Sequence, residues 1–221
     1  MHARLADLLT IVEATGVWFR ELLQGYVALI PKASGGSGPQ DQRPIAVLDV
    51  VYRLLAKVVT LSWATTLHGS FLGSSVLGFC AQAGTRHVTQ LPTDIVVLQK
   101  RRRKPLWLVS FDLEKCFASL PWWAVFNSLE HAGIPPHIVR CFQAFYAGLH
   151  QRFRLGQVDG EEWQACNGLA QGCPASPDLL NLLMEPFHRW ASGQGLGVTV
   201  TEGIRVASVS YADDVGLTAE E

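Results

Sequence analysis

Three aspartates stand where carboxylates could hold metal ions. Asp213 and Asp214 are adjacent and lie between two apolar segments, and Asp112 ends the apolar run of residues 106–111. Carboxylates so placed repel each other unless a cation lies between them. Mg²⁺ prefers hard oxygen ligands and shares its shell with substrate phosphates, and two ions about 3.5–4 Å apart stabilise both oxygens of a phosphoryl transfer. The aspartates therefore predict a metal-assisted phosphoryl-transfer site, with a plain acidic hairpin turn as the alternative.

A glycine-rich segment supplies a second candidate site. Residues 168–177 read Gly-Leu-Ala-Gln-Gly-Cys-Pro-Ala-Ser-Pro and precede an apolar stretch that contains Asn181. Glycine permits close backbone approach to a ligand, and the amide of Gln171 offers both a donor and an acceptor. The pattern indicates a ligand-contacting loop, and an ordinary glycine-rich entry to a helix is the alternative.

The elements that position the aspartates can be predicted from hydrophobic patterns. The continuous apolar run before Asp112 is typical of a central strand covered on both faces. Residues 204–210 and 215–218 are predicted to be short strands, with Tyr211 to Asp214 as the turn between them. Residues 177–191 are predicted to form a helix.

The N-terminal half is predicted to contain a hairpin between helices. Residues 3–24 have helical spacing that Gly16 interrupts. Residues 26–30 and 44–48 read as strands, so Lys32 and Arg43 flank the loop between them. Asp49 is expected to cap the next helix. The side chains expected to be buried on that helix are Leu54, Leu55, Val58, Val59 and Leu61.

The middle of the chain is predicted to alternate helices with a second hairpin. Residues 69–84 are glycine-rich and are expected to be irregular. A helix is expected over 85–103, and Pro92 should kink it or delay its start. Two helices should cover 121–131 and 135–148. Strands at 151–157 and 162–166 are expected to flank a turn at Asp159-Gly160.

Composition bounds the class of protein. The chain has 221 residues, a hydrophobic fraction of 48%, a charged fraction of 17% and a net charge of -1, so it should form a globule. The basic run of residues 101–104 is either a solvated helix end or a phosphate contact. The five cysteines form no CxxC pair, which favours free thiols in a reducing compartment. With no long apolar stretch, we expect a soluble intracellular protein of the cytoplasm or nucleus, without membrane contact.

Taken together, five segments in order resemble the reverse transcriptase family, especially its non-LTR retrotransposon and group II intron branches. The resemblance runs from about Tyr26 to Glu221. The segments are residues 28–32 (Ala-Leu-Ile-Pro-Lys), 42–45 (Gln-Arg-Pro-Ile), 111–117 (Phe-Asp-Leu-Glu-Lys-Cys-Phe), 168–177 with Asn181, and 211–214 (Tyr-Ala-Asp-Asp).

The resemblance implies an α+β right-hand polymerase with fingers and palm, in which an antiparallel palm sheet packs on helices. It divides the chain into an N-terminal helical segment at 1–25, fingers at 26–105 and a palm at 106–221 that stops after the Tyr-Ala-Asp-Asp turn, with the thumb missing. It also implies two Mg²⁺ ions, with Mn²⁺ as a substitute. Asp112 and Asp213 would bind both metals, Asp214 would support them, and the carbonyl of Leu113 would complete one shell.

The resemblance also assigns nucleotide contacts. Lys32 and Arg43 would clamp the incoming triphosphate, as suits a point charge and a planar fork for phosphate oxygens. Gln171 and Gly172 would pack against the nucleotide and template, and Tyr211 would lie near the primer terminus. Phe117 would lie under the sugar and exclude a 2′-hydroxyl, with a core aromatic as the alternative.

The sequence also departs from the family pattern. Cys116 stands for the usual Ala, Ala118 for an acid and Ala170 for a common Arg. These changes leave the metal ligands intact but put substrate contacts in doubt. The chain ends seven residues after Asp214, so we expect a duplex held without a thumb to dissociate quickly.

The leading hypothesis is an RNA-directed DNA polymerase domain from a retroelement. It would use an RNA template, a DNA primer and deoxynucleoside triphosphates. An RNA-dependent RNA polymerase is an alternative that Phe117 and the Ala212 of the turn disfavour. A truncated remnant that only binds nucleic acid is the other alternative.

Overall fold

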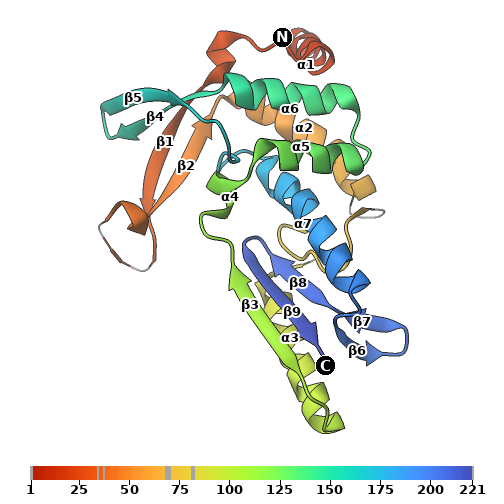
Figure 1. Cartoon of the computed structure of the whole chain (residues 1–221). Coiled ribbons are helices and arrows are strands. Elements are labelled where there is room, and N and C mark those ends of the chain that lie inside the picture. The colour runs from red at the N-terminus through yellow and green to blue at the C-terminus, as the bar shows by residue number, and fades with distance from the viewer. Residues whose placement is uncertain (1, 34, 37, 68–70, 81–82, 221) are drawn as a thin grey trace. The chain divides into compact units, whose positions relative to one another are not determined.

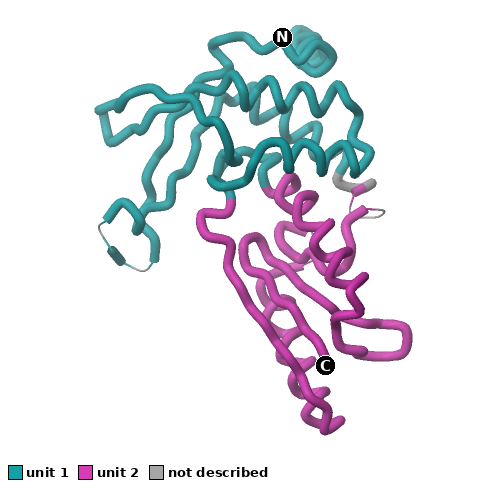
Figure 2. The backbone as a smooth tube through the Cα atoms, viewed as in Figure 1, with its two compact units in different colours: residues 1–63, 117–176 teal, residues 64–116, 177–221 magenta. Residues whose placement is uncertain are grey.

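The computed structural model describes residues 2–33, 35–36, 38–67, 71–80 and 83–220. The described residues form two compact units (Figure 2). Unit 1 comprises residues 1–63 and 117–176, and unit 2 comprises residues 64–116 and 177–221. Both units mix helices with mainly antiparallel strands, which confirms the α+β prediction. The three-segment division into 1–25, 26–105 and 106–221 stays a prediction.

Unit 1 contains a four-stranded sheet in the order β2-β1-β4-β5. Its strands are β1 (Gln24–Pro31), β2 (Gln42–Leu48), β4 (His150–Leu155) and β5 (Val158–Gln164). β1 pairs antiparallel with β2 and parallel with β4, and β4 pairs antiparallel with β5. β1 and β2 confirm the predicted first hairpin. The turn predicted at Asp159-Gly160 is wrong, because Gly156 adopts φ +62° and turns the chain two residues before β5 begins.

Four helices of unit 1 are visible in Figure 1. They are α1 (His2–Thr15), α2 (Val50–Thr66), α5 (Trp122–His131) and α6 (Pro136–Gly148), and a short 3₁₀ turn covers Arg20–Leu23. α1 ends where Gly16 turns left-handed at φ +69°. Asp49 caps α2 as predicted, since its Oδ1 accepts a hydrogen bond of 2.7 Å from the Val51 amide.

An aromatic cluster forms the core of unit 1. The rings of Tyr52 and Phe145 stack at 3.3 Å between centroids, and Trp18 packs against both. The burial predicted for α2 is half wrong, because Leu55 and Val59 are buried whereas the other three predicted residues are exposed. Those exposed residues are Leu54, Val58 and Leu61. Because α2 is apolar on more than one side, its sequence pattern does not show which side is buried. The second apolar stripe, formed by Leu54, Val58 and Leu61, has no partner among the described residues.

Unit 2 contains a three-stranded sheet in the order β3-β9-β8. Its strands are β3 (Trp107–Asp112), β8 (Ser208–Tyr211) and β9 (Asp214–Ala219), and β6 (Val198–Thr201) pairs with β7 (Ile204–Val206) beside it. The helices are α3 (Thr85–Arg102) and α7 (Ser176–Gly193), whose first residue belongs to unit 1, and α4 (Cys116–Ser119) joins the units along the chain. Pro92 lies inside α3 without ending it.

The prediction that β3 is a central strand covered on both faces is wrong. β3 is an edge of its sheet, and Trp107 is 66% exposed, with Leu108 and Val109 about half exposed. A continuous apolar run is consistent with burial on both faces but does not establish the covering elements. No helix in the described part of the chain meets the length and hydropathy of a membrane span.

Candidate active site

The three aspartates come together in unit 2, at one end of its sheet. Asp112 ends β3 and is the register partner of Asp214, which begins β9. Tyr211 ends β8 and also pairs with Asp214, so Ala212 and Asp213 make the turn. The Leu113 amide donates a 3.1 Å hydrogen bond to the Asp213 carbonyl oxygen. Strand pairing alone therefore places the predicted metal ligands beside one another, and Figure 1 shows the three strands β3, β9 and β8 that carry or flank them.

The turn itself adopts an unusual backbone. Ala212 has φ +55°, in the left-handed region that non-glycine residues seldom occupy. Residues 75–78 run beside β8 and brace it, since the Ser210 amide donates to the Ser75 carbonyl (2.8 Å) and the Leu77 amide donates to the Ser210 carbonyl (2.9 Å). A Cβ on Gly78 would lie 2.5 Å from the Ala212 nitrogen, so only glycine fits there.

The composition of the carboxylate end suits a hard cation. Asp112 and Asp214 are exposed, and Asp213 is half-buried. Within the described part of the chain, none of the three forms an ion pair or hydrogen bond through its side chain. Among the residues that the structure describes, no three or more His, Cys, Asp or Glu side chains come together so that they could hold a metal ion. The carboxylates are thus adjacent and unneutralised, and their side chains are not already drawn together around one point.

The two aspartates Asp112 and Asp213 affect the pKa of the nearby Cys116 thiol. Burial, and then the negative Asp213 and Asp112, raise the pKa of the Cys116 thiol from 9.0 to about 11. A thiol with that pKa stays protonated at neutral pH and is a poor nucleophile or metal ligand. The cysteine that replaces the family's usual alanine therefore acts as a small apolar residue.

Unit 1 holds the other predicted contacts, beginning with the β1–β2 hairpin. Arg43 pairs in register with Ile30, and the Lys32 amide donates to the Asp41 carbonyl oxygen at 2.7 Å. Both cations are exposed at the loop end of the hairpin. Residues 34 and 37 of the intervening loop lie outside the described residues.

The glycine-rich loop docks on β2 within the same unit. The Ala46 amide donates a 2.6 Å hydrogen bond to the Gln171 carbonyl oxygen. Gly172 has φ +117°, and a Cβ there would lie 2.3 Å from the Ala46 carbonyl oxygen. Next along the chain, the Cys173 sulfur lies 2.9 Å from the Tyr52 hydroxyl in the core. The structure therefore fixes the Gln171-Gly172 pair by backbone contact with β2, and the predicted contact of this loop with a ligand stays a prediction.

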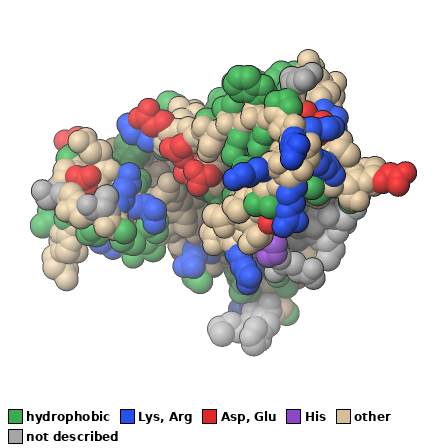
Figure 3. All heavy atoms as spheres, turned by 90° about the horizontal axis from the view of Figure 1, so that it is seen from below, with side chains coloured by type: hydrophobic (Ala, Val, Ile, Leu, Met, Phe, Trp, Pro, Cys, Tyr) green, Lys and Arg blue, Asp and Glu red, His purple; other side chains and the backbone are tan. Residues whose placement is uncertain are grey.

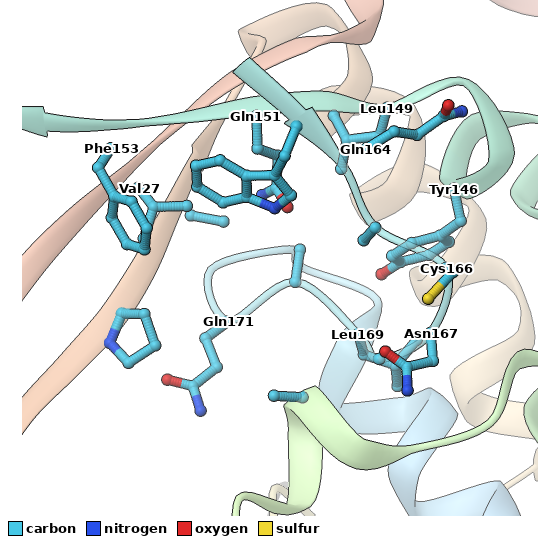
Figure 4. A pocket seen from close by; sticks show the side chains of 17 residues that line it. Val27, Tyr146, Leu149, Gln151, Phe153, Gln164, Cys166, Asn167, Leu169 and Gln171 are labelled. Atoms are coloured by element: carbon cyan, nitrogen blue, oxygen red, sulfur yellow. The ribbon is translucent and has the colours of Figure 1, made fainter. Parts of the chain in front are cut away.

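Gln171 borders a cavity of about 460 Å³, shown in Figure 4. Aromatic walls come from Tyr146, Phe153 and Trp163, and the last two rings lie 4.7 Å apart. The remaining polar lining is largely carboxamide, from Gln151, Gln164, Asn167 and Gln171, without a charged side chain. The Oε1 atom of Gln171 is buried without a hydrogen-bond partner. An uncharged planar group with a donor fits such a lining better than a phosphate does.

Phe117 lies in α4, and its carbonyl oxygen accepts a 2.6 Å hydrogen bond from the Leu169 amide. The structure thus joins Phe117 to the glycine-rich loop in unit 1, while the aspartates and Tyr211 lie in unit 2.

On the face in Figure 3, basic side chains lie among acidic and hydrophobic ones, which agrees with the net charge of -1.

Two supports of the turn were not predicted as site residues. Gly78 was placed only in an irregular segment, and Asn181 appeared only as part of a motif. The Asn181 amide, 2% exposed, donates a 2.7 Å hydrogen bond to the Gly78 carbonyl oxygen. A buried asparagine among leucines is the signal that could have pointed to this support, since buried amides need partners.

Comparisons with known proteins identify the family of the chain. The family model for reverse transcriptase (RNA-dependent DNA polymerase) matches residues 30–221. The Pol polyprotein of retrotransposable element R2DM from Drosophila melanogaster is 30% identical over 193 residues, which are 86% of this chain and 18% of that protein. The transposon TX1 149 kDa protein of Xenopus laevis is 24% identical over 88% of this chain and 15% of its own length.

Solved structures give the same fold. The apo telomerase of Candida tropicalis, truncated from its C-terminal domain, superposes with a TM-score of 0.64 at 16% identity, over 99% of this chain and 48% of the other. The chain belongs to the reverse transcriptase family, in the branch of the R2 and TX1 retrotransposons. Its fold is that of the fingers and palm. It spans less than a third of the length of the curated relatives that it matches.

Proposed function

We propose that this chain is the catalytic part of an RNA-directed DNA polymerase that adds deoxynucleotides to a primer 3′-hydroxyl on an RNA template. The observation that carries the proposal is the register Asp112↔Asp214, with Asp213 in the turn and all three carboxylates unneutralised. Family members generally use divalent metal ions, and these oxygen donors fit Mg²⁺ or Mn²⁺.

Asp112, Asp213 and Asp214, with the Leu113 carbonyl, would hold the two ions. When bound, the ions would stabilise the negative charge that develops on the attacking primer 3′-oxygen and on the leaving pyrophosphate. The chain's own part is to fix the backbone that carries the carboxylates on paired strand ends, which limits how far the side chains would have to move to hold cations. Tyr211, which stacks on Phe79 at 6.2 Å, would lie near the primer terminus.

The residues of unit 1 would bind the nucleotide. Lys32 and Arg43 would contact the triphosphate, because both cations are exposed at the hairpin end. Gln171 and Gly172 would pack on the nucleotide, which the rigid docking of their backbone on Ala46 supports. Phe117 would select deoxynucleotides by excluding a 2′-hydroxyl. The comparisons with retrotransposon proteins favour this function over RNA-directed RNA synthesis.

The test is primer extension on an RNA template with Mg²⁺. Asp213→Asn keeps the shape of the side chain but removes its charge, so we expect extension to fall by a factor of about 10³ or more. Asp159→Asn, on the exposed β4–β5 hairpin, is the matched control and should extend like the parent. Equal extension by Asp213→Asn and the parent, with the fold intact by circular dichroism, would refute the assignment.

Incorporation of ribonucleotides tests the alternative hypothesis, an RNA-dependent RNA polymerase. The parent should use deoxynucleotides in preference to ribonucleotides, and Phe117→Ala should narrow that preference, because the space under the sugar opens. The measurement is the ratio of kcat/KM for the two nucleotides. A parent that prefers ribonucleotides would instead support RNA synthesis.

A further inference from the structure

Helix α7 carries three polar side chains that are buried along one face. They are Asn181, Glu185 and His188, which are 2%, 3% and 3% exposed. Spacings of four and three residues put them on the same side of a helix. Buried polar groups cost stability unless they are hydrogen-bonded, so the partners of these three show what the face holds.

Two of the three hold the loop that braces β8. The Asn181 amide donates to the Gly78 carbonyl oxygen at 2.7 Å, and Glu185 Oε2 accepts a 2.9 Å hydrogen bond from the Gly73 amide. Arg189 pairs with the other oxygen of Glu185 at 2.9 Å. α7 therefore fixes both ends of the segment that runs beside β8.

His188 holds β8 directly. Its Nδ1 lies 2.7 Å from the Ser208 hydroxyl, and its Nε2 lies 2.8 Å from the Ser210 hydroxyl. Both serines are at most 2% exposed. A neutral imidazole has one N–H donor and one acceptor nitrogen, so one serine accepts a hydrogen bond and the other donates one. Burial lowers the pKa of His188, although Glu185 opposes the shift, and the ring is therefore held neutral.

The clamped serines are coupled to the carboxylates through the strand register. Ser210 pairs with Val215, and the next pair is Tyr211 with Asp214. The turn that contains Asp213 is closed by that pair. A shift of β8 along or away from α7 would therefore move both aspartates of the doublet together.

We infer that His188 is a positioning residue that fixes the carboxylate turn by clamping Ser208 and Ser210 to α7. The inference rests on the proposed function, because it assigns His188 to the positioning of the proposed metal ligands. His188 is not a catalytic residue, since its ring nitrogens face serines and not the carboxylates. Its loss would leave two buried hydroxyls unpaired and slacken β8.

The test compares His188→Leu, which removes both hydrogen bonds, with His188→Gln, which retains one donor and one acceptor. Displacement of a catalytic group by about 1 Å can cost about 100-fold in rate, so we expect His188→Leu to lower kcat for extension by at least about tenfold. The KM for the deoxynucleotide should change less than kcat, because Lys32, Arg43 and Gln171, which are proposed to contact it, lie in unit 1. His188→Gln should restore most of kcat.

Two further measurements do not depend on activity. His188→Leu should weaken Mn²⁺ binding, followed by electron paramagnetic resonance, and should speed hydrogen exchange of amides 208–217 more than that of unit 1. Ser210→Ala, a milder change, should do the same to a smaller extent if His188→Leu does not fold. Its effect should be lost in the His188→Leu background, because the two residues share one interaction.

Trp190→Leu is the matched control. It changes a large side chain of α7 that is 54% exposed and whose ring, among the described residues, pairs with Phe187 and not with His188, Ser208 or Ser210. The inference is overturned if His188→Leu keeps the parent's Mn²⁺ affinity and exchange rates, or if Trp190→Leu reproduces its effects. A parent that binds Mn²⁺ but extends no primer would defeat the proposed function, while the exchange comparison would still decide the role of His188.

Discussion

Two loops for which we propose a function, one in each unit, are fixed by a glycine that touches a neighbouring backbone. In unit 1, Gly172 lies against the Ala46 carbonyl, and in unit 2, Gly78 lies against the Ala212 amide nitrogen. The glycine belongs to the functional loop itself in the first case and to a separate bracing segment in the second. Both contacts join residues far apart in sequence, but only the first glycine lies in a local motif that the sequence reveals.

The largest loss of stability is expected from Gly172→Ala, which tests whether this glycine anchors its loop. The substitution strains a φ of +117° and drives a Cβ to within 2.3 Å of the Ala46 oxygen. We expect the free energy of unfolding to fall by about 3 kcal/mol, measured by urea denaturation. Gly160→Ala is the control in the same unit, since its Cβ would meet only ordinary contacts at 3.7 Å. If the two variants were equally stable, Gly172 would not anchor the loop.

Gly78→Ala should have the next largest effect. Its Cβ would lie 2.5 Å from the Ala212 nitrogen, but its φ is not in the left-handed region, so we expect a loss of about 2 kcal/mol. Hydrogen exchange should quicken around the turn, in amides 208–217. Gly193→Ala is the control, because nothing lies within 4 Å of its Cβ. Unchanged exchange at the turn in Gly78→Ala would show that the bracing segment can move away at little cost.

The smallest expected effect is that of acid, which should destabilise the loop of unit 2 but not the loop of unit 1. An unfolded chain protonates His188 at its ordinary pKa of 6.5, whereas the folded chain, with a lowered pKa, does so only at lower pH. The unfolded state then binds more protons, so stability should fall as pH drops below 6.5. The charged groups known to act near this ring are Glu185 and its partner Arg189.

The loop of unit 1 rests on groups that do not titrate in that range. Burial raises the pKa of both Tyr52 and Tyr146, which therefore stay neutral in acid. Between pH 7 and 5, the protection from hydrogen exchange, taken relative to the intrinsic exchange rate at each pH, should fall at amides 208–217 before it does at amides 168–173. His188→Gln should reduce the pH dependence, and a parent and variant with the same pH profile would contradict the assignment to His188.

How far sequence reasoning reached depends on the range of the interactions. The family motifs predicted Asp112, Asp213 and Asp214 as metal ligands, and the strand register places Asp112 opposite Asp214, while their role stays a prediction. The predicted β4–β5 turn was displaced because Gly156-Gln157 and Asp159-Gly160 are both plausible turns, and only the pairing of Arg154 with Asp159 decides between them.

The rest was beyond a single sequence for a physical reason. Which side of an all-apolar segment is covered depends on the neighbouring elements, so neither the exposure of β3 nor that of the second α2 stripe was predictable. The clamp at His188 joins residues 20 and 22 positions apart, and a lone histidine among apolar residues carries no sign of its partners.

The exposed edge strand β3 has a practical consequence at the bench. Trp107 and its neighbours present both apolar surface and the free hydrogen-bonding groups of a sheet edge, which can pair with a second molecule. Concentrated stocks of this polypeptide should thus form oligomers by strand addition, and the turbidity of a stock should rise with concentration at a fixed temperature. Dilute samples, or a Lys in place of Val109, should postpone that assembly.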